Sequence, residues 1–141
     1  MKSVFEFAAR HVEPSLKKSL ILKLLARNIN RAYIAKCLGI SPSLITRYVR
    51  GERGLHDLGA IGEVNLKLED IADKIARGEI CGWKAYIEVA RLTMYVLYKK
   101  YACGIHYLAT RDVNPSSCNI CPTIFRDFSN KYPLDNYFSK P

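Results

Sequence analysis

The sequence predicts an all-α protein. Its periodic segments carry apolar residues three or four positions apart, which is the spacing of amphipathic helices. These segments are bounded by helix start and stop signals, such as Asn30, Gly39 and the Ser41-Pro42 pair. The 141 residues are 49% hydrophobic and 25% charged, which is the composition of an ordinary globular domain.

Two helices are expected before residue 28. Residues 3–12 form a short amphipathic helix that ends before Pro14, because a proline disfavours helix at the residue that precedes it. A second helix starts near Ser15 and ends at Asn28. Its apolar side comprises Leu16, Leu20, Ile21, Leu24 and Leu25.

Two short helices follow with clear end signals. Asn30 can cap a helix that runs through Leu38, with Gly39 just past its end. The next helix starts at Ser41-Pro42, since serine accepts bonds from orphan amides and proline fits the first turn, and it ends at Gly51.

The second half of the chain predicts two further helices after a glycine-rich connector over 54–65. One covers 66–77 and stops at Gly78, and the other covers 83–101. The longer helix carries a heptad-like seam of Trp83, Ile87, Ala90, Met94, Leu97 and Tyr101. Its polar stripe is narrow, so most of its sides must be covered. From Arg126 onward no periodicity is clear.

The net charge of +9 is concentrated at the N-terminus. Residues 1–55 contain eleven Lys/Arg and three Asp/Glu, residues 56–101 seven of each, and residues 102–141 four and three. Solvated helix faces usually mix the two signs, whereas this N-terminal segment is nearly free of acids. The distribution favours a polyanionic partner.

Three positions within 33–54, "YIAKCLGISPSLITRYVRGERG", have the spacing of a helix-turn-helix. This motif needs a small residue where its helices cross, a residue that tolerates positive φ in the turn, and a buried branched residue in the second helix. Ala35, Gly39 and Ile45 supply the three in order. A plain hairpin of two packed helices is the alternative, and the basic surroundings favour DNA binding.

The stretch "NRAYIAKCLGISPSLITRYVRGERG" resembles the helix-turn-helix of repressor-type (XRE/Cro-like) regulators, with "VEPSLKKSLILKLLARNI" as the helix before it. With "IARGE" and the cysteine-bearing C-terminus, residues 3–121 resemble small archaeal predicted transcriptional regulators. Ala90 and Thr93 stand where several members carry a further Cys-x-x-Cys. The organisation expected is an N-terminal repressor-like helix-turn-helix bundle (1–55), helical dimerisation region (56–101), and Cys/His cluster with an irregular tail (102–141).

The resemblance implies that helix 42–50 enters the major groove of double-stranded DNA. By position, Ser43, Leu44, Thr46 and Arg47 would then touch the DNA, and the short side chains of Ser43 and Thr46 suit either a base edge or a phosphate. Arg47 is the expected base reader, because its planar guanidinium can donate two bonds to guanine. The residues expected to hold phosphates, without reading sequence, are Arg31, Lys36, Arg50 and Arg53.

The C-terminal cysteines and a histidine have the spacing of a metal site. "CGIH" and "CNIC" give Cys-x2-His-x11-Cys-x2-Cys through Cys103, His106, Cys118 and Cys121. This set suits tetrahedral zinc, with an iron–sulfur cluster as the less favoured cofactor. A Cys118–Cys121 disulfide, a Cys103-linked disulfide and four unrelated residues are the alternatives.

The other two cysteines are expected to be thiols. A cytosolic chain keeps its thiols reduced, except in hyperthermophiles, where intracellular disulfides are common. Cys37 is expected to be a small buried hydrophobe. Cys81 is expected to be a packed thiol, with a redox-active one as the alternative.

The function expected is that of a sequence-specific, DNA-binding transcriptional regulator. It acts in the cytoplasm, as a homodimer through the 56–101 helices, because most such proteins place two recognition helices about one DNA turn apart. No apolar run approaches the roughly 20 residues that span a bilayer, so no membrane partner is expected. The alternative is a metal-binding adaptor or RNA-binding interaction module. An enzyme is not expected, since a Cys103–His106 pair lacks a third orienting group.

Overall fold

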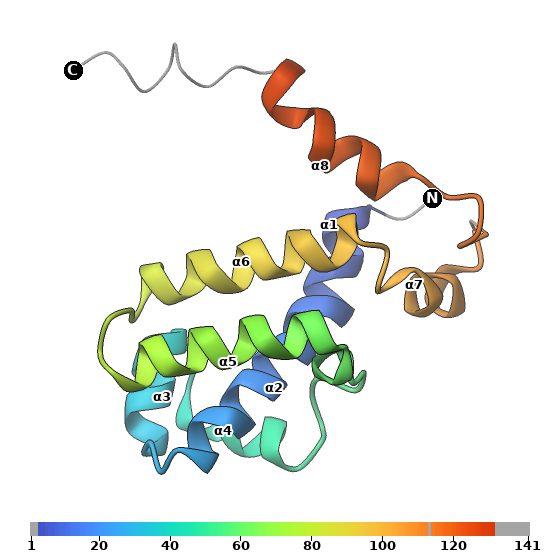
Figure 1. The fold of residues 1–141 in the computed structure, drawn as a ribbon. Helices are drawn as coiled ribbons and strands as arrows, with labels where there is room; N and C mark the ends of the chain where they lie inside the picture. Colours follow the sequence, from blue (N-terminus) through green and yellow to red (C-terminus); the bar gives the residue numbers. More distant parts are fainter. Residues whose placement is uncertain (1–2, 113, 132–141) are drawn as a thin grey trace.

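The computed structural model describes residues 3–112 and 114–131, which form helices joined by short loops and contain no strand (Figure 1). The all-α prediction is confirmed for these residues. None of the described helices has the length and apolar character needed to cross a membrane. The elements are α1 (Val4–Phe7), the π-helical η1 (Ala8–Val12), α2 (Glu13–Ala26), α3 (Arg31–Leu38), α4 (Pro42–Val49), the 3₁₀-helical η2 (Leu58–Ala60), α5 (Gly62–Ala76), α6 (Trp83–Tyr98), α7 (Cys103–Thr110) and α8 (Ile120–Lys131).

The N-terminal helix does not end at Pro14, and the predicted break there is wrong. α1, η1 and α2 follow one another without a gap, with Pro14 in the first turn of α2. A proline inside an α-helix removes one amide donor and crowds the carbonyl four residues earlier. Here the preceding turn widens to a π-helix, in which the Glu13 amide donates to the Ala8 carbonyl five residues back. The wider turn lets the helix continue past the proline ring.

The helix pair α3–α4 has the predicted end signals. Asn30 Oδ1 accepts the Tyr33 amide at 2.8 Å, and Ser41 Oγ accepts the Leu44 amide at 3.2 Å. Gly39 has φ +65°, in the left-handed region that glycine adopts without strain. The backbone therefore closes the tight turn that the sequence predicts.

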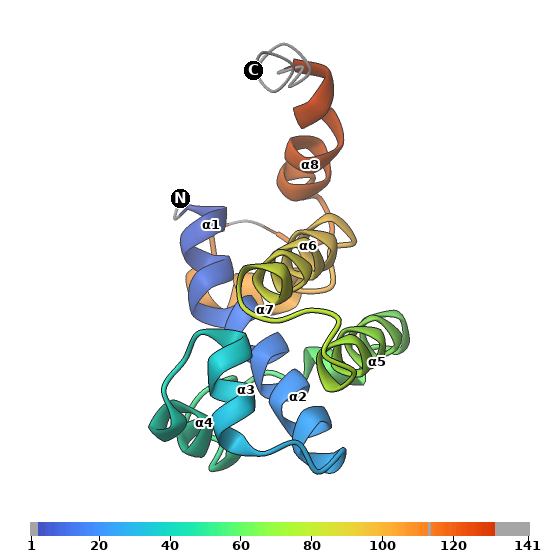
Figure 2. The same ribbon diagram turned by 90° about the vertical axis from the view of Figure 1, so that its left-hand side faces the viewer.

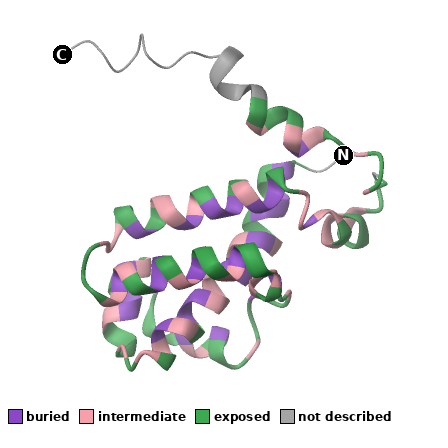
Figure 3. Ribbon diagram, viewed as in Figure 1, coloured by how far each residue is buried: buried purple, intermediate pink, exposed green. Residues whose placement is uncertain are grey.

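α2 is the centre of the bundle, and the other helices pack around it. It contacts α3 and α4 on one flank and α5 and α6 on another (Figure 2). The inward sides of these helices form one hydrophobic core, with Leu16, Ile34, Ile45 and Leu68 fully buried (Figure 3). This core continues across the boundaries near residues 55 and 101 that the sequence suggests.

The long helices differ from expectation at their ends. α5 begins at Gly62, inside the connector expected over 54–65, and α6 ends at Tyr98. Within the heptad-like seam, Trp83 and Met94 are exposed, but Leu97 is buried in the protein's own core. The seam is therefore only partly open on the surface.

The C-terminal segment is more regular than predicted. It contains α7 and α8, although no helix was expected after residue 101. Asn114 forms a turn between them, since its Oδ1 accepts the Ser116 amide at 2.9 Å and its carbonyl accepts the Cys118 amide at 3.0 Å. α8 packs against α6. The part of the expected irregular tail over 132–141 lies outside the described residues.

A disulfide joins Cys37 in α3 to Cys81 just before α6. The expectation that both remain thiols is wrong, although Cys37 is fully buried as expected. The two residues are 44 positions apart, and the Gly82 amide also donates to the Cys37 carbonyl at 2.9 Å. The second half of the chain is thus attached covalently to the first helix of the α3–α4 pair.

Candidate nucleic-acid interface and cysteine cluster

α4 is held by its apolar side and leaves the opposite side to solvent. Ile45 and Tyr48 are buried against the core, and Ala35 of α3 lies buried where the two helices meet. α4 also packs against α2. The roles predicted for Ala35, Gly39 and Ile45 in packing and turning match their burial and backbone conformation.

The residues predicted to face DNA lie on the outer side of α3 and α4. Ser43, Arg47 and Arg50 are exposed, whereas Leu44 and Thr46 are half-buried. Arg31 Nη1 donates to Thr46 Oγ1 at 3.2 Å, which links the start of α3 to the middle of α4. Thr46 Oγ1 also donates to the Pro42 carbonyl at 3.4 Å. Arg31 and Thr46 are therefore already engaged with each other on this surface.

Arg47 has an acidic neighbour that was not singled out from the sequence. Its Nε lies 3.3 Å from Glu52 Oε2, and both side chains are about half exposed. Glu52 is the single acid of residues 31–53, which contain five basic residues. The loop after α4 returns to the helix because Gly51, with φ +76°, turns the chain there. The guanidinium keeps its two Nη groups available for another partner.

Three basic side chains surround α4 without an ion-pair partner among the described residues. Lys36, Arg50 and Arg53 are all exposed. They come from α3, the end of α4 and the following loop. We call the surface formed by these three with Ser43, Thr46 and Arg47 the basic face. It is the part of the chain best suited to a polyanion.

Other basic residues of the N-terminal segment serve a different purpose. Lys23 Nζ lies 2.6 Å from Glu69 Oε1, Arg27 also pairs with Glu69, and Arg27 Nε lies 3.0 Å from Asp73 Oδ1. These bonds from Lys23 and Arg27 hold the pKa of the Glu69 carboxyl to about 2. The hydrogen bond that Arg27 donates to Glu69 is the main cause that raises the pKa of Arg27. The charge of this part of α2 is thus satisfied within the protein by α5.

The residues predicted to bind metal lie close together at α7 and α8. Cys103, His106 and Cys121 line one small pocket with Phe7, Leu97 and Ala102. Cys103 and His106 are one turn apart on α7, and Cys121 lies in the first turn of α8. All three C-terminal cysteines are free thiols, so the alternatives that join Cys103, Cys118 or Cys121 in a disulfide are not observed.

Electrostatics shows that the three thiols influence one another. Burial, followed by the charges of Cys103 and Cys118, raises the pKa of Cys121 to about 11. The pKa of Cys103 is raised by burial, with an opposing effect of Lys100 and a further increase from Cys118. Among the described residues, however, no group of three or more His, Cys, Asp or Glu side chains is arranged to hold a metal ion.

His106 is the most unusual member of this cluster. Its ring stacks on Phe7 of α1, with centroids 4.3 Å apart and planes 20° apart. Its Nε2 atom is buried and has no hydrogen-bond partner among the described residues. Phe7 also stacks on His11, which in turn lies beside His56. Phe7 was not predicted from the sequence, because it lies far from His106 along the chain and only the fold brings the two rings together.

No protein-family model, curated protein or solved structure matches this chain. The resemblance to repressor-type regulators therefore depends on the motif residues alone. The fold shows where the two candidate sites lie. The basic face is on the α3–α4 flank of α2, and the cysteine cluster is at the C-terminal end of α6.

Proposed function

We propose that this protein is a sequence-specific, DNA-binding transcriptional regulator that reads the major groove with α4. The observation that carries the proposal is the basic face, where Lys36, Arg50 and Arg53 are exposed without acidic partners around a protruding, capped helix. Arg47 reads a base edge with its free Nη groups, and the three unpaired side chains contact phosphates. Arg31 bonds to Thr46 and aligns the two helices.

We also propose that a second copy of the chain covers the outer side of α6. Trp83 is 69% exposed and Met94 45% exposed, and Tyr86 and Tyr98 are exposed beside them. Such a stripe of large apolar side chains marks an interaction surface more often than a solvated one. We call these four residues the α6 stripe.

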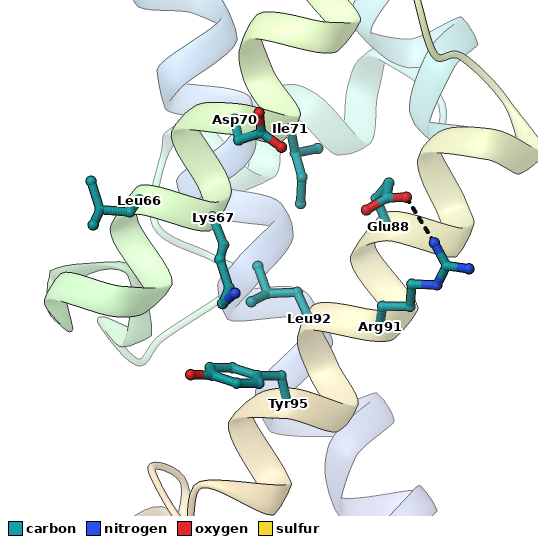
Figure 4. Close-up of a pocket in the computed structure, with 8 residues that line it drawn as sticks. All are labelled: Leu66, Lys67, Asp70, Ile71, Glu88, Arg91, Leu92 and Tyr95. Atoms are coloured by element: carbon teal, nitrogen blue, oxygen red, sulfur yellow. Dashed lines mark hydrogen bonds and ion pairs between the residues drawn. The ribbon is translucent and has the colours of Figure 1, made fainter. Parts of the chain in front are cut away.

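The groove next to the α6 stripe supports a second copy as the occupant. It runs between α5 and α6 with Ile71 and Leu92 at its base (Figure 4). Its rim carries both signs of charge, Lys67 and Arg91 against Asp70 and Glu88, and Arg91 Nη1 lies 3.1 Å from Glu88 Oε1. A two-fold interface uses the same surface on both subunits, so it requires a surface that can complement itself. A groove with both charges meets that requirement.

Pairing through α6 does not bring two α4 helices onto one duplex. α6 and α4 pack on opposite sides of α2 (Figures 1 and 2). The residues of the α6 stripe are exposed, so the stripe lies on the side of α6 turned away from α2. A two-fold axis that lies in an α6 interface would turn the second α4 to the opposite end of the dimer. We therefore infer that each copy contacts one DNA segment, instead of two half-sites one turn apart.

The test of DNA binding is a sequence selection from random duplexes with the wild-type protein, Arg47→Ala and Arg77→Ala. Wild type should select a single short motif without two-fold symmetry. Arg47→Ala should lose about 1–3 kcal/mol on that motif and relax the choice at one base position. Arg77, an exposed arginine of the α5 end, is the matched control and should behave as wild type. No selected motif, or a preference for single-stranded RNA at the same salt, would favour the RNA-binding adaptor instead.

The test of self-association is light scattering on wild type, on Trp83→Glu with Met94→Glu, and on Leu108→Glu. Leu108 is also 69% exposed but lies on α7, so it controls for adding a carboxylate to an apolar surface position. Wild type should be dimeric at micromolar concentration, the α6 double variant monomeric, and the α7 variant dimeric. A wild type that stays monomeric would refute the dimer and leave the DNA-binding proposal unaffected.

A further inference from the structure

Three thiols and one imidazole lie together at α7 and α8, and the proposed DNA-binding function assigns them no role. Four side chains of the types that bind zinc come from two helices and the loop before α8. Three of them line one pocket, and Cys118 lies three residues before Cys121. All three sulfurs are free, which leaves them available as thiolate ligands.

His106 gives the independent sign that a ligand belongs here. A buried imidazole nitrogen without a hydrogen bond destabilises the fold, so such atoms are rare in native proteins. Nε2 of His106 is in that state within the described residues, while Phe7 fixes the orientation of its ring. A metal ion would satisfy this nitrogen, because neutral imidazole coordinates zinc through one ring nitrogen.

We propose that Cys103, His106, Cys118 and Cys121 bind one Zn²⁺ ion. Three thiolates and one imidazole form a closed tetrahedral set of the structural type. In the present conformation the four donors do not form such a shell, so binding requires their side chains to rotate toward one another. The three thiols release three protons as the ion binds, and the site retains one negative charge.

The position of the site indicates what the ion does. α7 is exposed on most sides, with no buried residue among Cys103–Thr110, and so has little apolar contact to hold it. The ion would tie α7 to the start of α8, and through the stacked His106 and Phe7 it would fix both to the N-terminal helix. An ion bound in this way is structural, since all four coordination positions are occupied by protein.

The test is a titration of the full chain with Co²⁺, which reports thiolate ligation and tetrahedral geometry by its absorption. The protein is first freed of metal with chelator but not reduced, so that the Cys37–Cys81 disulfide stays intact. One Co²⁺ per chain should bind with thiolate charge-transfer and tetrahedral bands, and one equivalent of Zn²⁺ should remove them. Zn²⁺ should also protect all three free thiols from alkylation, as measured by mass spectrometry.

Variants then assign the ligands. Cys118 lies in the loop before α8, outside the buried core. The Cys118→Ser protein should therefore have the helical circular dichroism of wild type but bind Co²⁺ at least about tenfold more weakly. His106→Ala should remove the nitrogen ligand and weaken binding similarly. His56→Ala, a histidine outside the cluster, should bind as wild type. Absence of Co²⁺ binding, binding that survives Cys118→Ser, or a Cys118–Cys121 disulfide in freshly purified protein would each overturn the proposal.

Discussion

The two flanks of α2 use the same residue types in opposite ways. On the α5 flank, Lys23 and Arg27 are bound to Glu69 and Asp73 and stabilise the packing of two helices. On the α3–α4 flank, Arg50 and Arg53 are exposed and unpaired within the described residues. A count of basic residues along the chain treats all four alike. The difference teaches that the acids of a distant helix decide which positive charges remain for a ligand.

The largest change in stability is expected on the α3–α4 flank, because the disulfide attaches α3 to the start of α6. Cys81→Ser should lower the free energy of unfolding by about 4 kcal/mol, because it reopens a loop of 44 residues in the unfolded chain. Urea unfolding of wild type, with and without reductant, should show the same loss. All proteins are compared in the presence of chelator, so that Cys118→Ser, which removes a free thiol instead, serves as the control. Equal stability of wild type and Cys81→Ser would show that ion pairs and apolar packing suffice on both flanks.

Crossed arginine variants test the comparison directly. Arg27→Ala should lower the free energy of unfolding by about 1–2 kcal/mol, since it removes the charged hydrogen bonds to Asp73 and Glu69 at the partly buried α2–α5 contact. Its DNA affinity should stay unchanged.

Arg50→Ala should have the opposite effect. It should leave the free energy of unfolding unchanged, lower the affinity for all DNA sequences, and reduce the slope of log affinity against log salt concentration by about one. Urea unfolding and fluorescence anisotropy on one duplex measure both quantities, and an effect of Arg27→Ala on affinity would erase the distinction between the flanks.

Glu52, which pairs with Arg47 of the basic face, should weaken DNA binding. Glu52→Gln keeps the shape of the side chain but removes its charge, so affinity should rise roughly threefold on every duplex. Glu6→Gln removes an exposed acid of α1 and should have no effect. A loss of sequence selectivity with Glu52→Gln, without a gain in affinity, would mean that Glu52 orients Arg47.

The smallest effect is the acid sensitivity of the α5 flank. The pKa of Glu69 lies near 2, below its ordinary value of 4.5, so its ion pairs stabilise the fold fully above about pH 4.5. That stabilisation is lost as the pH falls toward 2, and amounts to about 1 kcal/mol or less because the side chains are partly solvated. Urea midpoints of wild type and Glu69→Gln should therefore converge as the pH falls. A constant gap would contradict the role assigned to Glu69.

Local signals in the sequence predicted the α3–α4 pair well. Its caps at Asn30 and Ser41 and its turn at Gly39 depend on neighbours within four residues, so the sequence contains all that fixes them. Pro14 shows the limit of the same approach. A proline usually ends a helix, but here the π-helical turn η1 lets the helix continue. That turn packs against α2 and α6, which are contacts that local sequence does not reveal.

Features that depend on distant contacts were not predictable. Cys37 and Cys81 are brought together only when α6 packs on α3, and nothing near either residue indicates the other. α7 and α8 were missed because their residues were assigned to the cysteine–histidine cluster and an irregular tail, although Ile120, Ile124 and Phe125 of α8 stand at helical spacing. The stacking of His106 on Phe7 also required the fold, whereas the spacing of Cys103, His106, Cys118 and Cys121 was visible in the sequence from the start.

The Cys37–Cys81 bond makes a closed covalent ring that contains α4, η2 and α5. A protease that cuts the chain once inside the ring cannot separate the two pieces. Trypsin acting at exposed Arg53 would thus produce a nicked molecule that migrates as one band on a denaturing gel and splits into two bands after reduction. α4 would then stay attached to the rest of the chain through the Cys37–Cys81 bond, even with the peptide backbone broken beside it.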